Sequence, residues 1–234
     1  MGKVGNVLDA LRKYYRVSSF GPGLGQSDIF RILVSTVLSQ RCNDENSERA
    51  AGNLFRKYRS PITIANAPVR ELERLIKPSG FYRVKARRLK EVSRIVVEKY
   101  GGKVPDSLDE LVKIPGIGRK TAGCVMVYGF SKPEGIPVDT HVHRVSNRLG
   151  LVKTRTPGKT EQELMRTVPK KYWILVNELM VLHGKNICKS RNPRCPLCPV
   201  KRYCEYYRNV YIGAGAGSIK RRINKTMLSR MRND

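Results

Sequence analysis

The chain has 234 residues, and its 46 lysines and arginines against 19 acidic residues give a formal net charge of +27. Its hydrophobic content of 40% excludes a disordered protein. It has no apolar run of the roughly 20 residues that a membrane span needs, and no apolar N-terminal leader. We therefore expect an intracellular, cytoplasmic protein with no signal peptide, transmembrane segment or membrane partner. The net charge favours a polyanionic partner, most commonly DNA or RNA. The alternatives are a generally basic protein without such a partner and a protein that contacts anionic membranes.

Apolar residues recur at helical spacing along most of the chain, and no convincing run of alternating strand residues is present, so we predict an all-α fold. In the first helix, the expected apolar face consists of Val7, Leu8, Leu11, Tyr14 and Tyr15. Ser27 can cap the second helix, and Ser107 with Glu110 has the spacing of a capping box. From Gly213 onward, the sequence combines a glycine- and alanine-rich start with several basic residues, which indicates a basic tail that either contacts DNA or has no specific role. The expected helices span residues 7–15, 27–40, 45–58, 68–80, 83–100, 140–149, 160–167 and 172–183.

A glycine-containing turn between two helices is the first chemical signal. The expected helix before it ends at Ile114, and the next helix begins near Arg119. The glycines leave the backbone amides open to an anion, and the second helix adds its positive end. The turn is therefore predicted to clamp a DNA phosphate through Pro115, Gly116, Gly118 and Arg119, the alternative being a tight turn without a ligand.

The whole segment from residue 111 to 122, LVKIPGIGRKTA, resembles the helix-hairpin-helix of the endonuclease III superfamily of base-excision DNA glycosylases. In the bifunctional members of that family, the lysine of the matching string attacks the sugar C1′ and forms a Schiff base. The resemblance therefore implies that Lys120 is the nucleophile. Its position in the first turn of a helix favours the neutral amine. Without the resemblance, Lys120 would be interpreted as one more phosphate-binding lysine.

Asp139 lies in a second segment, PVDTHVHR, from residue 137 to 144. By itself it is well placed to cap a helix that begins at Thr140. The resemblance adds that the Asp of a matching Val-Asp-Thr-His-Val segment stabilises positive charge at C1′ and helps to activate the nucleophile. His141 and Arg144 are expected near the DNA backbone, and His141 and His143 do not have the spacing of a metal pair.

Four cysteines, Cys188, Cys195, Cys198 and Cys204, have a six-two-five spacing. In a reducing compartment such a group indicates a metal or cluster rather than disulfides. Zinc is the alternative, although zinc modules usually show two close cysteine pairs. The spacing resembles the 4Fe-4S loop of endonuclease III and implies a 4Fe-4S cluster. The basic residues of the loop, Lys189, Arg191 and Arg194, would then face DNA phosphates. Cys42 and Cys124 are expected to be small core residues.

Two further positions concern access to the base, since a glycosylase must flip its target out of the duplex. The family has a Gln where the second helix ends. Here the ungapped match places Arg41 at that position, with Gln40 one residue earlier. Either residue could fill the space that the flipped nucleotide leaves in the duplex. Phe81 matches an apolar wedge that follows a glycine, although a core phenylalanine is the alternative.

The resemblance covers residues 5–208 and implies two all-α lobes with a DNA groove between them. The six-helix domain with the hairpin would span residues 23–136. The cluster domain would combine residues 1–22 with 137–208, and residues 209–234 would form the basic tail. Lys120 and Asp139 would face each other across the groove. The protein is expected to be a monomer associated with the nucleoid.

The implied function is base excision repair by a bifunctional DNA glycosylase/AP lyase, which removes oxidised pyrimidines and cleaves abasic sites by β-elimination. The partner is double-stranded DNA that contains damaged bases or abasic sites. A mismatch adenine glycosylase is disfavoured because Thr36 stands where that enzyme has Glu, and because Lys120 is present. The sequence is also compatible with a thymine or uracil mismatch glycosylase, or with a non-catalytic iron–sulfur DNA-binding protein. An electron carrier would explain the cysteines, but the charge argues against it.

Overall fold

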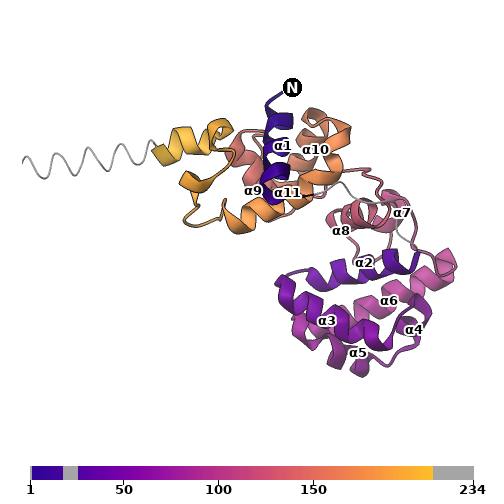
Figure 1. The fold of residues 1–234 in the computed structure, drawn as a ribbon. Helices are drawn as coiled ribbons and strands as arrows, with labels where there is room; N and C mark the ends of the chain where they lie inside the picture. Colours follow the sequence, from indigo (N-terminus) through magenta and orange to yellow (C-terminus); the bar gives the residue numbers. More distant parts are fainter. Residues whose placement is uncertain (1, 18–25, 213–234) are drawn as a thin grey trace, which may run out of the picture. The chain divides into compact units, whose positions relative to one another are not determined.

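The computed structural model describes residues 2–17 and 26–212, and these ranges contain helices and no strand (Figure 1). The all-α prediction is confirmed. The chain divides into two compact units, one formed by Met1–Ser18 with Val138–Asp234 and the other by Ser19–Pro137. Most of the predicted basic tail, from Gly213 onward, lies outside the described residues. No helix in the described ranges is both long and apolar enough to cross a membrane.

In the unit of residues 19–137, helix α2 packs on α3, α6 and α8 and is the centre of the core. Its residues Leu33 and Val37 are fully buried, together with Leu54, Leu89 and Leu111 from the surrounding helices. Burial of this apolar face is the main stabilising contribution. The helices of this unit are α2 Gln26–Ser39, α3 Asp44–Lys57, α4 Pro61–Asn66, α5 Val69–Ile76, α6 Tyr82–Tyr100, α7 Leu108–Val112 and α8 Arg119–Cys124.

Helix ends in this unit follow local chemistry. Asn43 caps α3 by accepting a hydrogen bond from the amide of Asn46 at 2.8 Å. Sequence analysis missed the short helix α4, although Ser60 and Thr63 form a capping box and Pro61 occupies its first turn. Helix α6 ends where Gly101 adopts a left-handed conformation.

Two expected caps and one expected core residue were wrong. Helix α2 begins at Gln26, so Ser27 lies inside the helix rather than before it. Ser107 makes no side-chain cap. The amide of Leu108 donates to the Glu134 carboxylate at 2.9 Å, and Glu110 pairs with Lys113. Tyr14, expected on the buried face of the first helix, is 50% exposed.

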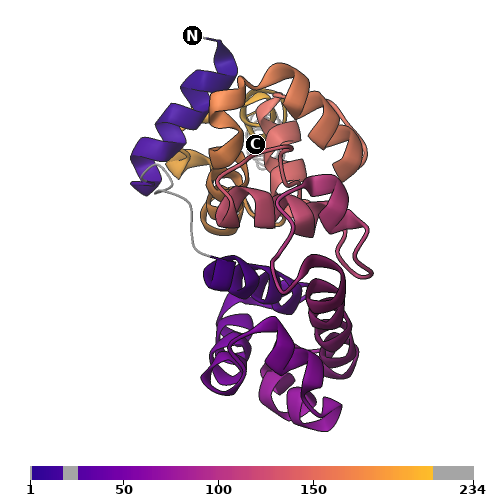
Figure 2. The same ribbon diagram turned by 90° about the vertical axis from the view of Figure 1, so that its right-hand side faces the viewer.

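The other unit is a smaller helical bundle in which α11 packs against both α1 and α9 (Figure 2). The helix α1 contributes Val7, Leu8 and Leu11 to the core, and all three are essentially inaccessible to solvent. The polypeptide after α11 continues through short 3-10 turns, Cys195–Leu197 and Lys201–Tyr203, which carry the last three cysteines or flank them. The longer helices are α1 Lys3–Tyr15, α9 Thr140–Leu149, α10 Pro157–Thr167 and α11 Trp173–Asn186.

Candidate functional site

The turn between α7 and α8 is anchored by two buried isoleucines. Ile114 and Ile117 are 1% and 3% exposed, and the amide of Ile117 donates to the Ile114 carbonyl at 3.0 Å. Gly116 lies between them with φ +83°, a conformation that favours glycine. Pro115, Gly116 and Gly118 are exposed, so the anchored turn presents backbone to solvent. Such a surface is open to an anion.

Gly116 also makes room for a side chain from the long helix. A Cβ at this position would overlap the Nε and Cδ atoms of Arg88. Arg88 in turn donates to the Gln40 side-chain oxygen at 3.1 Å, and the Gln40 amide nitrogen donates to Thr121 Oγ1 at 3.2 Å. These contacts join the end of α2, the helix α6 and the hairpin into one network. The oxygen and the nitrogen of the Gln40 side-chain amide are therefore both hydrogen-bonded within the unit.

Lys120 is the residue before Thr121, in the first turn of α8, and it is exposed, as is Arg119 beside it. The network around Thr121 fixes the backbone from which Lys120 projects, because Thr121 is 5% exposed and hydrogen-bonded. The structure thus holds a solvent-accessible amine next to the exposed glycine turn of the same unit.

Phe81 and Arg41 are both exposed and both have a positive φ, +46° and +50°. Phe81 exposes 63% of its surface, which excludes the interpretation of a core phenylalanine. The two residues line the same hollow of about 450 Å³, together with Gln40, Val84 and Arg88. Non-glycine residues in this conformation are uncommon and gather at functional positions. Of the two candidates at the end of α2, Gln40 is engaged within the unit, whereas Arg41 projects into solvent.

A buried lysine holds the two halves of this hollow together, and sequence analysis did not identify it. Lys85 is 3% exposed, and its Nζ donates to the carbonyls of Leu38 at 2.7 Å and Ser79 at 2.8 Å. The first carbonyl belongs to the last turn of α2 and the second to the turn that leads to Phe81. Burial lowers the pKa of Lys85.

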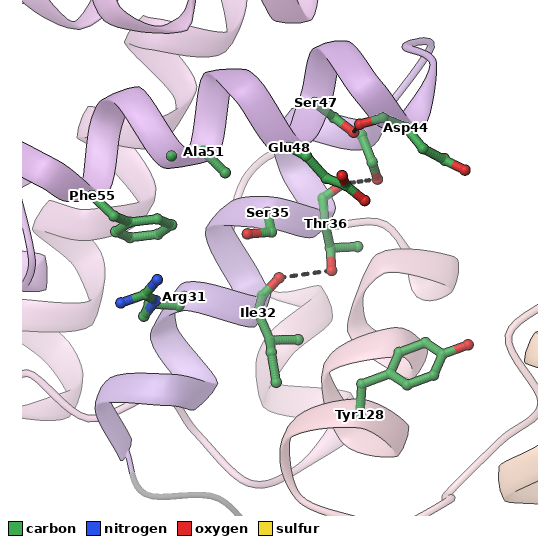
Figure 3. A pocket seen from close by; sticks show the side chains of 12 residues that line it. Arg31, Ile32, Ser35, Thr36, Asp44, Ser47, Glu48, Ala51, Phe55 and Tyr128 are labelled. Carbon is green, nitrogen blue, oxygen red and sulfur yellow. Dashed lines mark hydrogen bonds between the residues drawn. The ribbon is translucent and has the colours of Figure 1, made fainter. Parts of the chain in front are cut away.

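A pocket of about 580 Å³ lies between α2 and α3 (Figure 3). Arg31 lies over the Phe55 ring at one end, with 4.9 Å from the guanidinium carbon to the ring centroid. At the other end are the hydroxyls of Thr36 and Ser47 and the carboxylate of Asp44. Ser39 also lines the pocket, and it directly precedes Gln40, whose side chain reaches Thr121. The polar end of the pocket is thereby connected to the first turn of the hairpin helix that carries Lys120.

In the other unit, Asp139 caps α9 as expected. Its Oδ1 accepts hydrogen bonds from the amides of His141 and Val142, both at 2.8 Å. Within the described part of the chain, Oδ2 has no hydrogen-bond partner, and the side chain is half-buried. The cap fixes one carboxylate oxygen and leaves the second oxygen available to another group.

His141 and Arg144 form a structural network at the start of α9. Arg144 Nη2 lies 3.1 Å from His141 Nδ1, and because arginine can only donate, Nδ1 must accept. Burial lowers the pKa of His141, which favours this neutral form. Arg144 also donates to the carbonyls of Gly184 and Cys188, at 3.0 and 3.1 Å. A Cβ at Gly184 would come within 2.7 Å of His141 Nδ1, so this approach requires glycine.

The four predicted ligand cysteines line one small hollow. Leu149, Ile187 and Tyr207 also line it. All four cysteines are free, and burial raises the pKa of the Cys198 thiol to about 12. Cys42 is only half-buried, unlike the core residue expected, whereas Cys124 is buried.

Arg148, one helical turn after Arg144, holds the polypeptide that follows Cys188, and sequence analysis missed it. Its guanidinium donates to the carbonyls of Lys189 at 2.6 Å and Ser190 at 3.0 Å, and lies 3.6 Å from Cys188 Sγ. Its side chain also stacks on Tyr206 at 4.6 Å. Lys189 itself is exposed, as are Arg191 and Arg194. The sequence signal for Arg148 was its i, i+4 spacing from Arg144, which places both arginines on one face of the helix.

Comparison with known proteins gives a consistent result. Residues 34–170 match the model of the HhH-GPD superfamily base excision DNA repair proteins. The chain is 53% identical to endonuclease III of Thermotoga maritima over 200 residues, which cover 86% of this chain and 92% of that protein. It is 41% identical to endonuclease III of Bacillus subtilis, over 77% of this chain and 83% of the relative.

Solved structures agree with these relatives. A trapped endonuclease III–DNA covalent intermediate matches with a TM-score of 0.78 at 36% identity, covering 88% of this chain and 96% of that one. A thermostable thymine-DNA glycosylase has a TM-score of 0.76 at 24% identity, which shows a shared fold. The chain belongs to the HhH-GPD superfamily of base excision DNA repair proteins and, within it, to the endonuclease III family, whose members are DNA glycosylases and AP lyases.

Proposed function

We propose that Lys120 is the nucleophile with which this DNA glycosylase/AP lyase releases a damaged base and breaks the strand. The observation that carries the proposal is an exposed amine, next to the open Gly116–Gly118 turn, on a backbone fixed by the Gln40–Thr121 hydrogen bond. A nucleophile must be both accessible and held in one place. The second exposed lysine of this hairpin is paired with a glutamate instead.

The chemistry balances with a single amine. The Lys120 nitrogen attacks C1′, and the base leaves with the electrons of the glycosidic bond and takes up a proton. Ring opening gives an imine, which acidifies the C2′ proton. Loss of this proton expels the 3′ phosphate by β-elimination, and water then hydrolyses the imine and regenerates the amine. No other nucleophilic side chain is required.

Asp139 is proposed to stabilise the positive charge that develops at C1′ and to help to activate the nucleophile. Support comes from its cap geometry, in which only Oδ1 is used by the amides of α9. The helix cap holds the carboxylate in one rotamer, so that a fixed negative charge is available without reorganisation. Asp139→Asn keeps a good N-cap and removes the charge, so folding should be retained while base release slows by about 100-fold or more.

For DNA binding, we assign the backbone amides of Gly116 and Gly118, together with Arg119, to a DNA phosphate. Phe81 is proposed as the wedge that unstacks the neighbouring base step, and Arg41 as the residue that fills the space left by the flipped nucleotide. Gln40 has a positioning role, because its amide is occupied by Arg88 and Thr121. The loop residues Lys189, Arg191 and Arg194 would contact the backbone as a second basic surface.

We propose that the extruded base enters the pocket between α2 and α3. Its volume lies within the range of small-molecule sites, and Ser39 and Asp44 offer the polar groups that a pyrimidine edge requires. Oxidised pyrimidines such as thymine glycol are the expected substrates. Asp44→Asn should then weaken base excision and leave cleavage of abasic sites unchanged, because an abasic site has no base to recognise.

The four cysteines Cys188, Cys195, Cys198 and Cys204 are proposed to hold a 4Fe-4S cluster. All four line the same hollow of one unit, and none of them forms a disulfide. Their uneven spacing suits a cluster that binds each thiolate at a different iron. A bound cluster would stiffen the loop that Arg148 already holds.

The proposal is tested by borohydride trapping on a duplex with one abasic site. The wild-type protein should yield a covalent protein–DNA adduct, and Lys120→Gln should yield none while its DNA affinity changes less than about threefold. Lys113→Gln is the matched control, since Lys113 is an exposed lysine of the same hairpin. Robust trapping by Lys120→Gln, or loss of trapping in the Lys113 control alone, would refute the assignment. Similar adduct yields with thymine glycol and with a G·T mispair would refute the substrate preference only.

A further inference from the structure

A groove lined by four arginines lies on the unit of residues 19–137, and three of them, Arg49, Arg56 and Arg59, have no role in the reaction proposed above. The groove has a volume of about 680 Å³. Arg49 and Arg56 come from α3, Arg31 from α2, and Arg59 from the turn after α3; Gly52, Asn53 and Phe55 complete the lining. No acidic side chain lines it, and all four arginines are exposed.

The charge of this groove is not neutralised by the protein. In the described ranges, no carboxylate lies within 4.0 Å of any of the four guanidinium groups, although neighbouring Lys57 and Arg74 both pair with Glu71. Side-chain amides orient the guanidinium groups instead: Asn46 accepts from Arg49 at 3.1 Å, and Asn53 accepts from Arg56. Neutral acceptors position a cation without cancelling its charge, which leaves the groove ready for an external anion.

Two arginines of the groove are far enough apart to contact different phosphates. Arg49 and Arg56 are seven residues apart on one face of α3, which corresponds to about 10.5 Å along the helix. Each strand of duplex DNA carries one phosphate at every base-pair step, so two guanidinium groups at this separation can bind two different phosphates. Planar guanidinium groups bind phosphate oxygens in pairs. The Phe55 ring is 6% exposed and covered by Arg31, so the groove offers no free aromatic face on which the base of a mononucleotide could stack.

The groove adjoins the proposed base pocket, with which it shares Arg31, Gly52 and Phe55, but Arg49, Arg56 and Arg59 line the groove and not that pocket. Arg41 and the cap Asn43 mark the start of α3, and Arg49 to Arg59 continue along and past that helix. At the rise of about 1.5 Å per residue, Arg49 lies roughly 9 Å along α3 from Asn43, and Arg56 lies about 20 Å from it. A duplex that contacts both surfaces would be held over a longer stretch than the lesion itself requires.

We infer that this four-arginine groove binds the phosphate backbone of double-stranded DNA outside the lesion site, and that it strengthens binding to long, undamaged DNA. The inference rests on the proposed function only in taking DNA as the partner. Each phosphate contact releases counterions, so its contribution is seen in the salt dependence of binding. The groove should leave the chemical step untouched.

The test compares two double variants of the full-length protein that lose the same net charge. Arg49→Gln with Arg56→Gln removes the helical pair of the groove, and glutamine keeps the helix propensity of α3. Arg74→Gln with Arg94→Gln is the matched control, because both arginines are exposed in the same unit and pair with glutamates. Binding to an undamaged 30-base-pair duplex is measured from 50 to 300 mM salt. Circular dichroism checks that both variants are folded.

The groove variant should lose about 1.8 from the slope of log affinity against log salt, about 0.9 for each contact, whereas the control should keep the wild-type slope. Single-turnover trapping on saturating abasic DNA should be the same in all three proteins. An unchanged slope in the groove variant, or an equal loss in the control, would overturn the inference. Absent trapping in the wild-type protein would refute the proposed nucleophile instead, so the two failures are distinguishable.

Discussion

Replacing Lys85 with methionine should loosen the end of α2 from the turn that carries Phe81. The ammonium is 3% exposed and donates to the carbonyls of Leu38 and Ser79. Methionine fills a similar volume and donates nothing. Each buried carbonyl left without a partner costs about 1–3 kcal/mol, and relief from burying an ammonium offsets part of this. A net loss of about 2–4 kcal/mol in the free energy of unfolding follows.

Thermal unfolding measures this loss. In a chain of this size, 1 kcal/mol corresponds to a shift of roughly 2–4 °C in Tm, so Lys85→Met should unfold about 4–16 °C lower. Lys90→Met is the matched control on the same helix, because Lys90 is half-buried and donates to the carbonyl of Ala67 at 2.7 Å. It should lose about 1 kcal/mol. Equal Tm values for Lys85→Met and the wild-type protein would refute the argument that the two carbonyls depend on this ammonium.

Three further predictions follow from local geometry. Gly116→Ala should lower the free energy of unfolding by about 1–2 kcal/mol, because an L-residue is strained at φ +83° and its Cβ displaces Arg88. In the control Gly118→Ala the added Cβ has open space, so the free energy of unfolding should change by less than about 0.5 kcal/mol. Equal urea midpoints for the two variants would contradict this account. The pKa of His141 is lowered from its ordinary 6.5, so on acidification the unfolded chain takes up a proton before the folded protein does, and wild-type stability should fall as the pH drops below 6.5. His141→Asn should show a smaller decrease in urea titrations at several pH values. Identical pH profiles would contradict the assignment of His141 as a neutral hydrogen-bond acceptor. Metal analysis should return about four irons per chain and fewer for Cys198→Ser, whereas one zinc without iron would rule out the cluster.

The helical pattern was largely predictable because each long helix buries one apolar face and its ends carry local signals. Residues 140–149 were predicted to be a helix, and the helix α9 has these bounds. The helix α4 was missed because six residues are too few for a periodic pattern, so that only its capping residues identify it. Tyr14 was misassigned because its spacing fits the apolar face of α1, whereas it lies in the last turn of that helix and is 50% exposed.

The site residues that could be predicted differ from those that could not in how far along the sequence their contacts lie. The hairpin lysine and the cysteines lie in compact strings that carry their own signal. Lys85, Arg88 and Arg148 do not, because each acts on backbone or side chains far away in the sequence: Lys85 binds a carbonyl 47 residues away, and Arg148 one 41 residues away. An isolated basic residue in a chain with 46 of them cannot be distinguished by type. Only the fold shows which distant groups these side chains bind.

The central claim is that Lys120, among all the amines of the chain, forms the bond to DNA. Borohydride-reduced adduct should be digested with trypsin and nuclease, and the peptides sequenced by mass spectrometry. We predict that the nucleotide-derived mass is attached to Lys120 and that cleavage after this residue is blocked. Attachment to Lys113, to another lysine or to the N-terminal amine would contradict the mechanism.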